Sequence, residues 1–324
     1  MVSTAAVSFI TTDDDSAGQR LDNFLIRVLK GVPKTHVYRI IRSGEVRVNK
    51  GRAAADTRLQ AGDVLRLPPV RVSERAADKA EAMAQAAPPR EFPVLYENEH
   101  LIAINKPAGV AVHGGSGVSF GVIEQLRMAR PQARFLELVH RLDRDTSGIL
   151  LIAKKRSALR HLQDQFRERE TGKTYLALVR GDWPANKKVI DAPLHKYLLD
   201  AKEGSPGAGE RRVRVVSKDD PDGMRAITLV KVSRQLEIAA ERHTLLEVTI
   251  KTGRTHQIRV HLASQGHPIA GDDKYGDFDA NKALARAGLK RMFLHAWRLE
   301  FGHPATSERL TLVAELPPEL SVWH

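Results

Sequence analysis

The spacing of apolar residues near the start of the chain predicts two short helices. In the first, they recur at the three- and four-residue intervals of one helical face, at Leu21, Phe24, Leu25, Val28 and Leu29. Gly31 and Pro33 end this helix, because neither residue favours continuing it. A second, shorter helix follows with apolar positions at Val37, Ile40 and Ile41, and Ser43-Gly44 supplies its C-terminal signal.

Alternation of apolar and polar residues then predicts short strands. Val46 and Val48 alternate with charged and polar neighbours, and the run from Val64 to Leu67 offers a further strand. Together with the two helices, these strands predict a compact α-α-β module over residues 18–72. Residues 73–91 are rich in Ala and charge without apolar periodicity, so they are interpreted as a linker.

From residue 92 to about residue 320, strand-like runs alternate with helical stretches such as 158–166. The runs read VLYENEHLIAINKP, ILLIAKK, TYLALVRG, TLLEVTIKT and MFLHAWRLEF. This pattern predicts one large α+β domain with a mixed or largely antiparallel sheet. Residues 204–209 form a Gly, Ser and Pro loop within the long, Gly-rich region 201–243.

Composition narrows the class of protein. A length of 324 residues with 42% hydrophobic and 28% charged residues fits a two-domain globular chain. The absence of cysteine excludes disulfides, thiolate zinc sites and cysteine nucleophiles. Because no apolar run approaches the length of a membrane span and the start lacks a basic signal region, we expect a cytoplasmic protein without a membrane partner.

The charge balance indicates a polyanionic partner. Lys and Arg number 51 against 39 Asp and Glu, a formal net charge of +12. Between Arg20 and Arg71 the ratio is twelve to four, so the small module holds a large share of the excess. Charge alone does not separate RNA from DNA or a membrane surface, and a merely solvated basic face is the simpler alternative. The candidate phosphate contacts are Lys30, Lys34, Arg39, Arg42, Arg47 and Lys50.

The most informative segment is LVHRLDRDTSGILLIAKK, residues 138–155, in which a charged, hydroxyl-rich loop lies between two apolar runs. Such loops often carry active sites. Asp143 and Asp145 are its carboxylates, while Thr146, Ser147 and Gly148 favour a tight turn. From the residues alone, a structural role as a turn cap or in a salt bridge is the favoured explanation for either Asp.

Three motifs in order resemble the RluA-type family of pseudouridine synthases. They read VHRLDRDTSGILL, GKTYLALVRG and KTGRTHQIRVHL. Around residues 17–52 the basic module also resembles the RNA-binding module first known from ribosomal protein S-four. The resemblance covers nearly the whole chain. Region 201–243, which is long and Gly-rich, departs from the family pattern.

The resemblance implies an enzyme that converts uridine to pseudouridine in large-subunit (23S) ribosomal RNA. It implies that Asp143 is the catalytic carboxylate, that Tyr175 packs against the target base and that Arg259 pairs with Asp143. Arg141 would fill the space left by the flipped uridine, and Arg254 and His140 would contact the substrate. No metal, nucleotide or other cofactor is expected, and the protein is expected to act as a monomer.

The implied reaction breaks the N1–C1′ bond, turns the base and rejoins it through C5, which needs neither a redox group nor an energy source. A carboxylate could attack C1′ or remove the C2′ proton, and both routes stay open. A stacked uridine must first be flipped out, at a cost of a few kcal/mol.

Other interpretations have weaker support. Gly172-Lys173-Thr174 lacks the upstream glycine of a P-loop, since Arg167 stands there. The spacings of His256, His261 and His267 put no pair on one helical face, which disfavours a metal site. A metal-dependent hydrolase would have only the adjacent Asp272 and Asp273 as further carboxylate ligands for its metal, and these two residues suit the cap of a turn better. An RNA-binding ribosome assembly factor without catalysis remains the main alternative.

Overall fold

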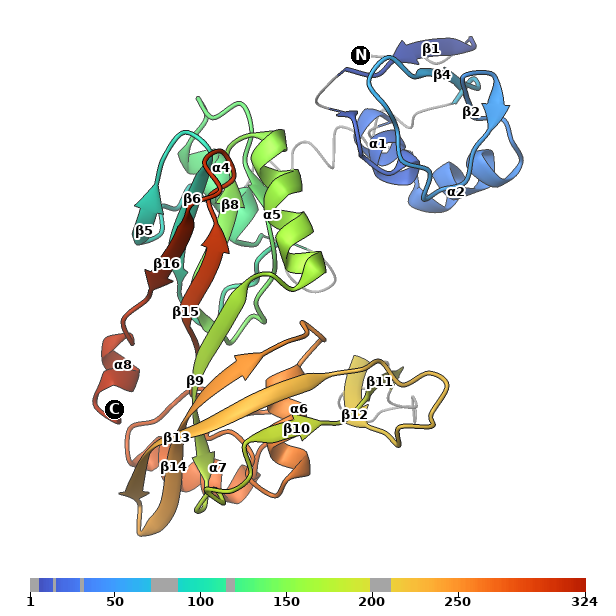
Figure 1. The fold of residues 1–324 in the computed structure, drawn as a ribbon. Helices are drawn as coiled ribbons and strands as arrows, with labels where there is room; N and C mark the ends of the chain where they lie inside the picture. Colours follow the sequence, from blue (N-terminus) through green and yellow to red (C-terminus); the bar gives the residue numbers. More distant parts are fainter. Residues whose placement is uncertain (1–5, 14–15, 30–31, 71–86, 115–119, 199–210) are drawn as a thin grey trace. The chain divides into compact units, whose positions relative to one another are not determined.

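The computed structural model describes residues 6–13, 16–29, 32–70, 87–114, 120–198 and 211–324. Backbone contacts divide the chain into two compact units, residues 1–90 with 115–120, and residues 91–114 with 121–324 (Figure 1). Most of the expected linker, residues 73–86, and the expected loop at 204–209 lie outside the described residues. Among the helices described, none has the length and apolar content needed to cross a membrane.

The first unit packs two helices against one antiparallel sheet. The helices are α1 (Leu21–Val28) and α2 (Lys34–Arg42), and the strands, in sheet order, are β1 (Ser8–Thr11), β4 (Val64–Leu67), β2 (Arg47–Val48) and β3 (Gly51–Arg52). Both predicted helices and the strands β2 and β4 are confirmed. Strand β1 is not among the predicted elements and lies before residue 18, where the module was expected to begin.

One face of this sheet is buried and the other is open to water. The core joins apolar side chains of both helices and of β4, among them Leu21, Leu25, Val37, Ile40, Leu65 and Leu67. Along β4 the alternate residues Val64 and Arg66 point away from that core. An antiparallel sheet tolerates this arrangement, because its ladder needs covering on only one side.

A ten-stranded mixed sheet forms the second unit, as predicted for the larger domain. Its order is β10-β13-β14-β9-β15-β8-β6-β5, with β7 paired to β8 and β16 to β15. The strand bounds are β5 (Val94–Glu97), β6 (Leu101–Lys106), β7 (Glu137–Leu138), β8 (Ser147–Ala153), β9 (Gly172–Arg180), β10 (Val189–Asp191), β13 (Ile227–Ile238), β14 (Glu241–Ile250), β15 (Leu294–Gly302) and β16 (Arg309–Val313). Among the described strands, β15 and β8 are the one pair that runs parallel. A separate hairpin holds β11 (Leu194–Leu198) and β12 (Arg211–Val215).

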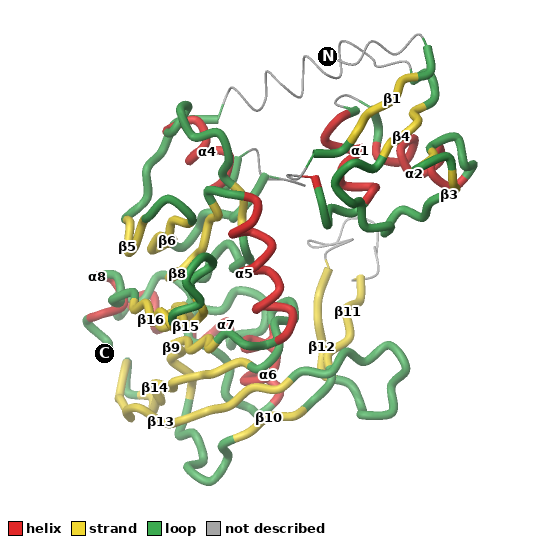
Figure 2. Tube along the Cα trace, turned by 45° about the horizontal axis from the view of Figure 1, so that its top comes forward, coloured by secondary structure: helices red, strands yellow, loops and turns green. Residues whose placement is uncertain are grey.

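Helices cover both faces of the large sheet (Figure 2). Their bounds are α4 (Val122–Ala129), α5 (Arg156–Glu168), α6 (Gln257–Ser264), α7 (Phe278–Arg286) and α8 (Pro318–Ser321). On one face, α4 packs on β6 and β8 while α6 packs on β9 and β14, which gives two neighbouring cores. The opposite face carries α5 over β8 and β15, and α7 and α8 over β9 and β14. Alternate residues of each central strand therefore enter different cores.

The centre of the sheet depends on a close approach of two parallel strands. Gly148 at the start of β8 pairs with Ala296 of β15, which in turn lies opposite Tyr175 of β9. Gly148 has φ +111°, and a Cβ there would lie 2.3 Å from the carbonyl oxygen of Ala296. Only glycine fits both the backbone conformation and this contact.

Gly148→Ala should destabilise the second unit by about 2–4 kcal/mol, because left-handed strain adds to a clash with backbone. Chemical denaturation followed by tryptophan fluorescence measures this loss. Gly266→Ala is a matched control, since Gly266 has φ +82° but nothing within 4 Å of an added Cβ. Equal losses for the two variants would contradict the close-packing argument.

Candidate active site

Asp143 lies in the loop that connects β7 to β8, directly before the central strand. The amide of Thr146 donates to the Asp143 carbonyl oxygen at 3.2 Å, which closes a turn over residues 143–146. The turn was expected at Thr146, Ser147 and Gly148, but Ser147 and Gly148 already pair with β15 as the start of β8. The Asp145 carboxylate instead accepts from its neighbour Arg144, with Nε 3.1 Å from Oδ1. The two carboxylates of the loop therefore have different surroundings.

A buried lysine fixes the backbone of this loop. Lys106, at the end of β6, is fully buried, and its Nζ donates to the carbonyl oxygens of Pro107 (2.8 Å), Val110 (2.8 Å) and Arg144 (3.0 Å). Burial lowers the pKa of Lys106. Three carbonyl acceptors leave no direction for a nitrogen lone pair, so the ammonium is the form that suits this cage. Lys106 thus ties the loop after Asp143 to β6.

Tyr175 lies where the two cores on one face of the sheet meet. It projects from β9 and packs against both the α4 core and the α6 core. Burial, together with the nearby Asp143 charge, raises the pKa of Tyr175, so its hydroxyl stays protonated at neutral pH. A rigid aromatic ring is therefore presented beside the carboxylate.

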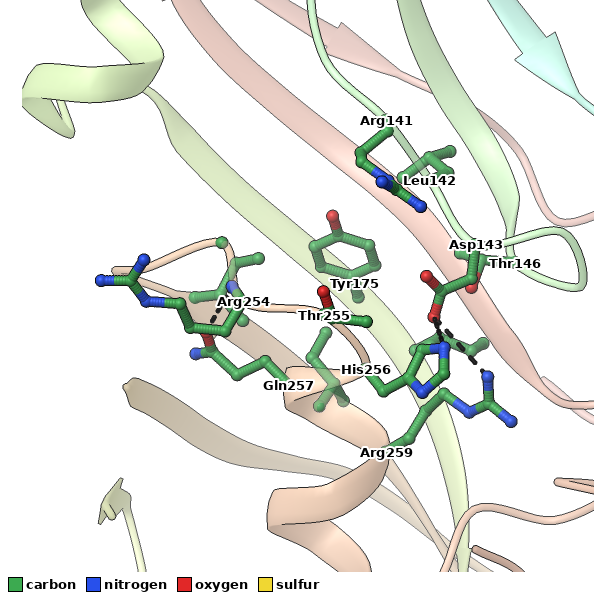
Figure 3. Close-up of a pocket in the computed structure, with 14 residues that line it drawn as sticks. Arg141, Leu142, Asp143, Thr146, Tyr175, Arg254, Thr255, His256, Gln257 and Arg259 are labelled. Carbon is green, nitrogen blue, oxygen red and sulfur yellow. Dashed lines mark hydrogen bonds and ion pairs between the residues drawn. The ribbon is translucent and has the colours of Figure 1, made fainter. Parts of the chain in front are cut away.

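These side chains line one small pocket of about 120 Å³ (Figure 3). The loop of Asp143 forms one wall, Tyr175 the floor, and the segment leading into α6 the opposite wall. Its lining residues are Arg141, Leu142, Asp143, Thr146, Tyr175, Ile250, Gly253, Arg254, Thr255, His256, Gln257, Ile258, Arg259 and Leu294. Among the described residues that line it, Asp143 is the one carboxylate, so the site differs from one built on a carboxylate pair.

Arg259 of α6 reaches Asp143, but its closest partner is another residue. Its Nη1 lies 3.6 Å from Asp143 Oδ2, an ion pair longer than a hydrogen bond. Meanwhile Nε and Nη2 each donate at 2.7 Å to the fully buried Asp272, and Nη2 lies 3.3 Å from Asp273. Asp272 also accepts from the amides of the following turn, so it both caps that turn and fixes Arg259. Asp272 therefore holds the Arg259 guanidinium in place beside Asp143.

His256 is a second neighbour of Asp143, and it was considered from the sequence only as a metal ligand. It caps α6 with φ 52°, an uncommon conformation for a non-glycine residue. Its Nδ1 lies 2.8 Å from the Tyr275 hydroxyl, and its Nε2 lies 3.8 Å from Asp143 Oδ2. Because Tyr275 also accepts from the Val213 amide, its own proton can go to Nδ1, which leaves the ring proton on Nε2. Burial lowers the pKa of His256, so this ring is neutral at neutral pH.

The three residues expected to contact substrate lie in different places. Arg141 is exposed at the mouth of the pocket, on the side of Tyr175 and Asp143 (Figure 3). Arg254 lines the pocket, yet its side chain turns away from Asp143, and its Nε donates to the Arg225 carbonyl at 3.3 Å. His140 is not in the lining: it stacks on Phe166 and accepts from the Leu151 amide at 3.1 Å. Burial lowers the pKa of His140 to about 3, so the ring is neutral, and its lone pair is used inside the fold.

The candidate phosphate contacts divide between two parts of the first unit. Lys34, Arg39 and Arg42 are exposed on α2, whereas Arg47 and Lys50 belong to the β2–β3 hairpin. Lys30 lies outside the described residues.

The histidines weighed as metal ligands are held apart. His261 lies 2.8 Å from Thr228 Oγ1, and His267 lies 2.9 Å from the Arg180 carbonyl. Within the described ranges, one group has ligand atoms close enough for a metal ion, and its members are His195, Asp220 and Asp222. None of these three lines the pocket of Asp143.

Comparisons with known proteins agree with this architecture. The family model described as RNA pseudouridylate synthase matches residues 100–264, and the S4 domain model matches residues 19–65. The first match runs from β6 to α6 and so contains the loop of Asp143, β9 and most of the pocket wall.

Relatives match almost the entire chain. The ribosomal large subunit pseudouridine synthase C of Pasteurella multocida (strain Pm70) is 52% identical over 97% of this chain and 92% of its own length, and that of Escherichia coli (strain K12) is 51% identical over 97% and 94%. A solved structure named human RNA pseudouridylate synthase domain containing 1 is 25% identical, with a TM-score of 0.57 over 72% of this chain and 86% of its own. Given the matched fold, the shared motifs and this identity, the chain belongs to the RNA pseudouridylate synthase family.

Proposed function

We propose that this protein isomerises selected uridines of large-subunit ribosomal RNA to pseudouridine, with Asp143 as the catalytic carboxylate. The observation that carries the proposal is a pocket with a single carboxylate, which Arg259 and His256 face from one side and Tyr175 borders on another. The relatives' shared name supplies the class of RNA. In this proposal the protein acts in the cytoplasm as a monomer.

The chemistry needs no group from outside the chain. The N1–C1′ bond breaks, the uracil turns, and a C5–C1′ bond forms; the proton leaves C5 and N1 gains one, so the formula is unchanged. Charge developing on the sugar is stabilised by an ionised carboxylate, whether Asp143 bonds to C1′ or removes the C2′ proton. Arg259 places a positive charge beside that carboxylate, with Nη1 3.6 Å from its Oδ2.

The small pocket suits a single base rather than a stacked strand. A uridine flipped out of its helix would place its ring on Tyr175, and base–aromatic stacking offsets part of the cost of unstacking. Arg141, exposed at the mouth, would occupy the vacated position with a planar cation. Arg254 would contact the RNA backbone from the rim, whereas His140 has no role in this proposal.

The first unit would hold the RNA through phosphate contacts. Its candidates are Lys30, Lys34, Arg39, Arg42, Arg47 and Lys50, and such contacts make affinity fall with salt. Pseudouridine mapping in ribosomal RNA from cells with and without the protein tests the function directly. Loss of specific pseudouridines in large-subunit RNA is the expected result. An unchanged map would favour an assembly factor without catalysis.

His256→Asn should lower kcat about tenfold and leave KM within about twofold, because one polar contact to a charged group is lost near the reacting carboxylate. Asparagine tolerates the left-handed backbone at this position. Tyr275→Phe should give a smaller loss, since it removes only the hydroxyl that orients the ring.

A double variant distinguishes positioning from independent effects. If Tyr275 acts through His256, the double variant is no slower than His256→Asn alone. Losses in kcat that multiply would contradict the pathway from Tyr275 to Asp143. Single-turnover pseudouridine formation is the measurement.

A further inference from the structure

The open face of the small sheet carries one aromatic and three arginine residues in a single row. Phe9 of β1 lies directly opposite Arg66 of β4, which lies opposite Arg47 of β2, which lies opposite Arg52 of β3. Directly opposed residues of antiparallel strands share a face. Figure 1 shows β1, β4 and β2 side by side, with α1 and α2 of the same unit below them.

The residues of this row destabilise the free protein unless a ligand covers them. Phe9 is 67% exposed, the largest exposure among the large apolar side chains of the first unit's described part. Like charges directly opposed across strands repel each other. Among the ion pairs between described residues, none involves Arg47, Arg52 or Arg66. The Arg66 guanidinium donates to the Glu45 carbonyl oxygen at 3.0 Å. No ion pair among the described residues therefore neutralises these three arginines.

The same face is hollowed. An open depression of about 860 Å³ is lined by Phe9, Gly44, Arg47, Asn49, Lys50, Val64 and Arg66. Lys50 stands at its edge with φ 67°, in the left-handed region that a lysine rarely adopts. Such a volume accommodates more than one nucleotide-sized group.

We propose that this face binds an unpaired segment of RNA, with one base stacked on Phe9 and the flanking phosphates on Arg66, Arg47 and Arg52. Aromatic rings interleaved with cations are typical of surfaces that bind single strands, because every base has a π face and every nucleotide a phosphate. The choice of RNA as the polyanion rests on the proposed function, whereas the preference for a single strand rests on the face itself. Bases inside a duplex are covered by their neighbours and cannot reach Phe9.

Phe9→Leu in the full chain tests the proposal, because leucine keeps an apolar side chain and removes the π face. Fluorescence anisotropy would measure binding of a labelled oligouridylate and of a blunt RNA duplex of the same length. Affinity for the single strand should fall roughly 5- to 150-fold, while affinity for the duplex stays within twofold. Phe9→Trp should restore single-strand binding, and Val7→Ala, an exposed apolar residue outside the row, should leave it unchanged. Arg47→Gln should reduce the slope of log affinity against log salt concentration by about 1, the amount expected for one lost phosphate contact.

Single-strand binding by Phe9→Leu that equals the wild type would overturn the proposal, and so would an equal loss for the duplex. These outcomes are separable from failure of the proposed function. An unchanged pseudouridine map with a selective Phe9→Leu defect would refute catalysis and keep the binding face. Loss of specific pseudouridines from the map, with oligouridylate binding by Phe9→Leu equal to wild type, would support catalysis and refute the binding face.

Discussion

Asp143→Asn should reduce single-turnover pseudouridine formation at least about 1,000-fold while RNA affinity stays within a few-fold of wild type. The substitution keeps the shape of the side chain and removes the charge that both candidate routes need. Asp143 is 23% exposed at the pocket, where Arg259 Nη1 and His256 Nε2 lie 3.6 and 3.8 Å from its Oδ2. RNA affinity is spread over many phosphate contacts, so it does not depend on this carboxylate.

Asp145→Asn is the matched control, two residues along the same loop. Its carboxylate pairs with Arg144 and does not line the pocket, so activity should stay within a few-fold of wild type. Activity in Asp143→Asn close to wild type, or a large loss confined to Asp145→Asn, would refute the assignment. Filter binding on the same preparations separates loss of chemistry from loss of RNA.

Asp272→Asn should destabilise the second unit by about 3–5 kcal/mol, because it leaves the guanidinium of Arg259 buried with its main partner neutralised. Arg259 and Asp272 are 2% and 0% exposed, and two hydrogen bonds of 2.7 Å join them. Since Asp272 fixes the arginine that faces Asp143, activity should fall as well. Urea unfolding followed by tryptophan fluorescence reports on this unit, which holds all three Trp residues.

The pH dependence of the free energy of unfolding gives a second measurement on the pair of Arg259 and Asp272. Burial alone would raise the pKa of Asp272, but the hydrogen bonds from Arg259 bring it below its usual value. A carboxylate whose pKa is lower in the folded state than in the unfolded state stabilises the fold at pH values above its unfolded pKa, near 4. This stabilisation is lost as the pH falls further. Wild type should therefore lose stability below about pH 4 more steeply than Asp272→Asn. Asp273→Asn, 60% exposed at its side chain, is the control and should behave like wild type.

Local patterns along the sequence sufficed for much of the secondary structure. Three- and four-residue spacing predicted α1 and α2, because each buries only one stripe of its surface, and the helical stretch expected at 158–166 lies within α5. The apolar run before Lys154 predicted β8, whose residues are all buried between two layers of helices. The motifs around Asp143, Tyr175 and Arg259 predicted a shared site, and the fold brings these three residues to one pocket.

Other features depended on residues that meet only after folding. Helix α6 is buried on nearly every side, so no apolar stripe marks it, and β1 is four residues long and forms only by pairing with β4. The preference of Arg259 for Asp272, the contact of His256 with Asp143 and the cage around Lys106 each join separate segments of the chain. Local sequence patterns determined most of the helices and strands and which motif residues could react. The tertiary structure decided the partner of each buried charge, because the energy of an ion pair or a buried hydrogen bond depends on distances and burial that spacing along a chain does not fix.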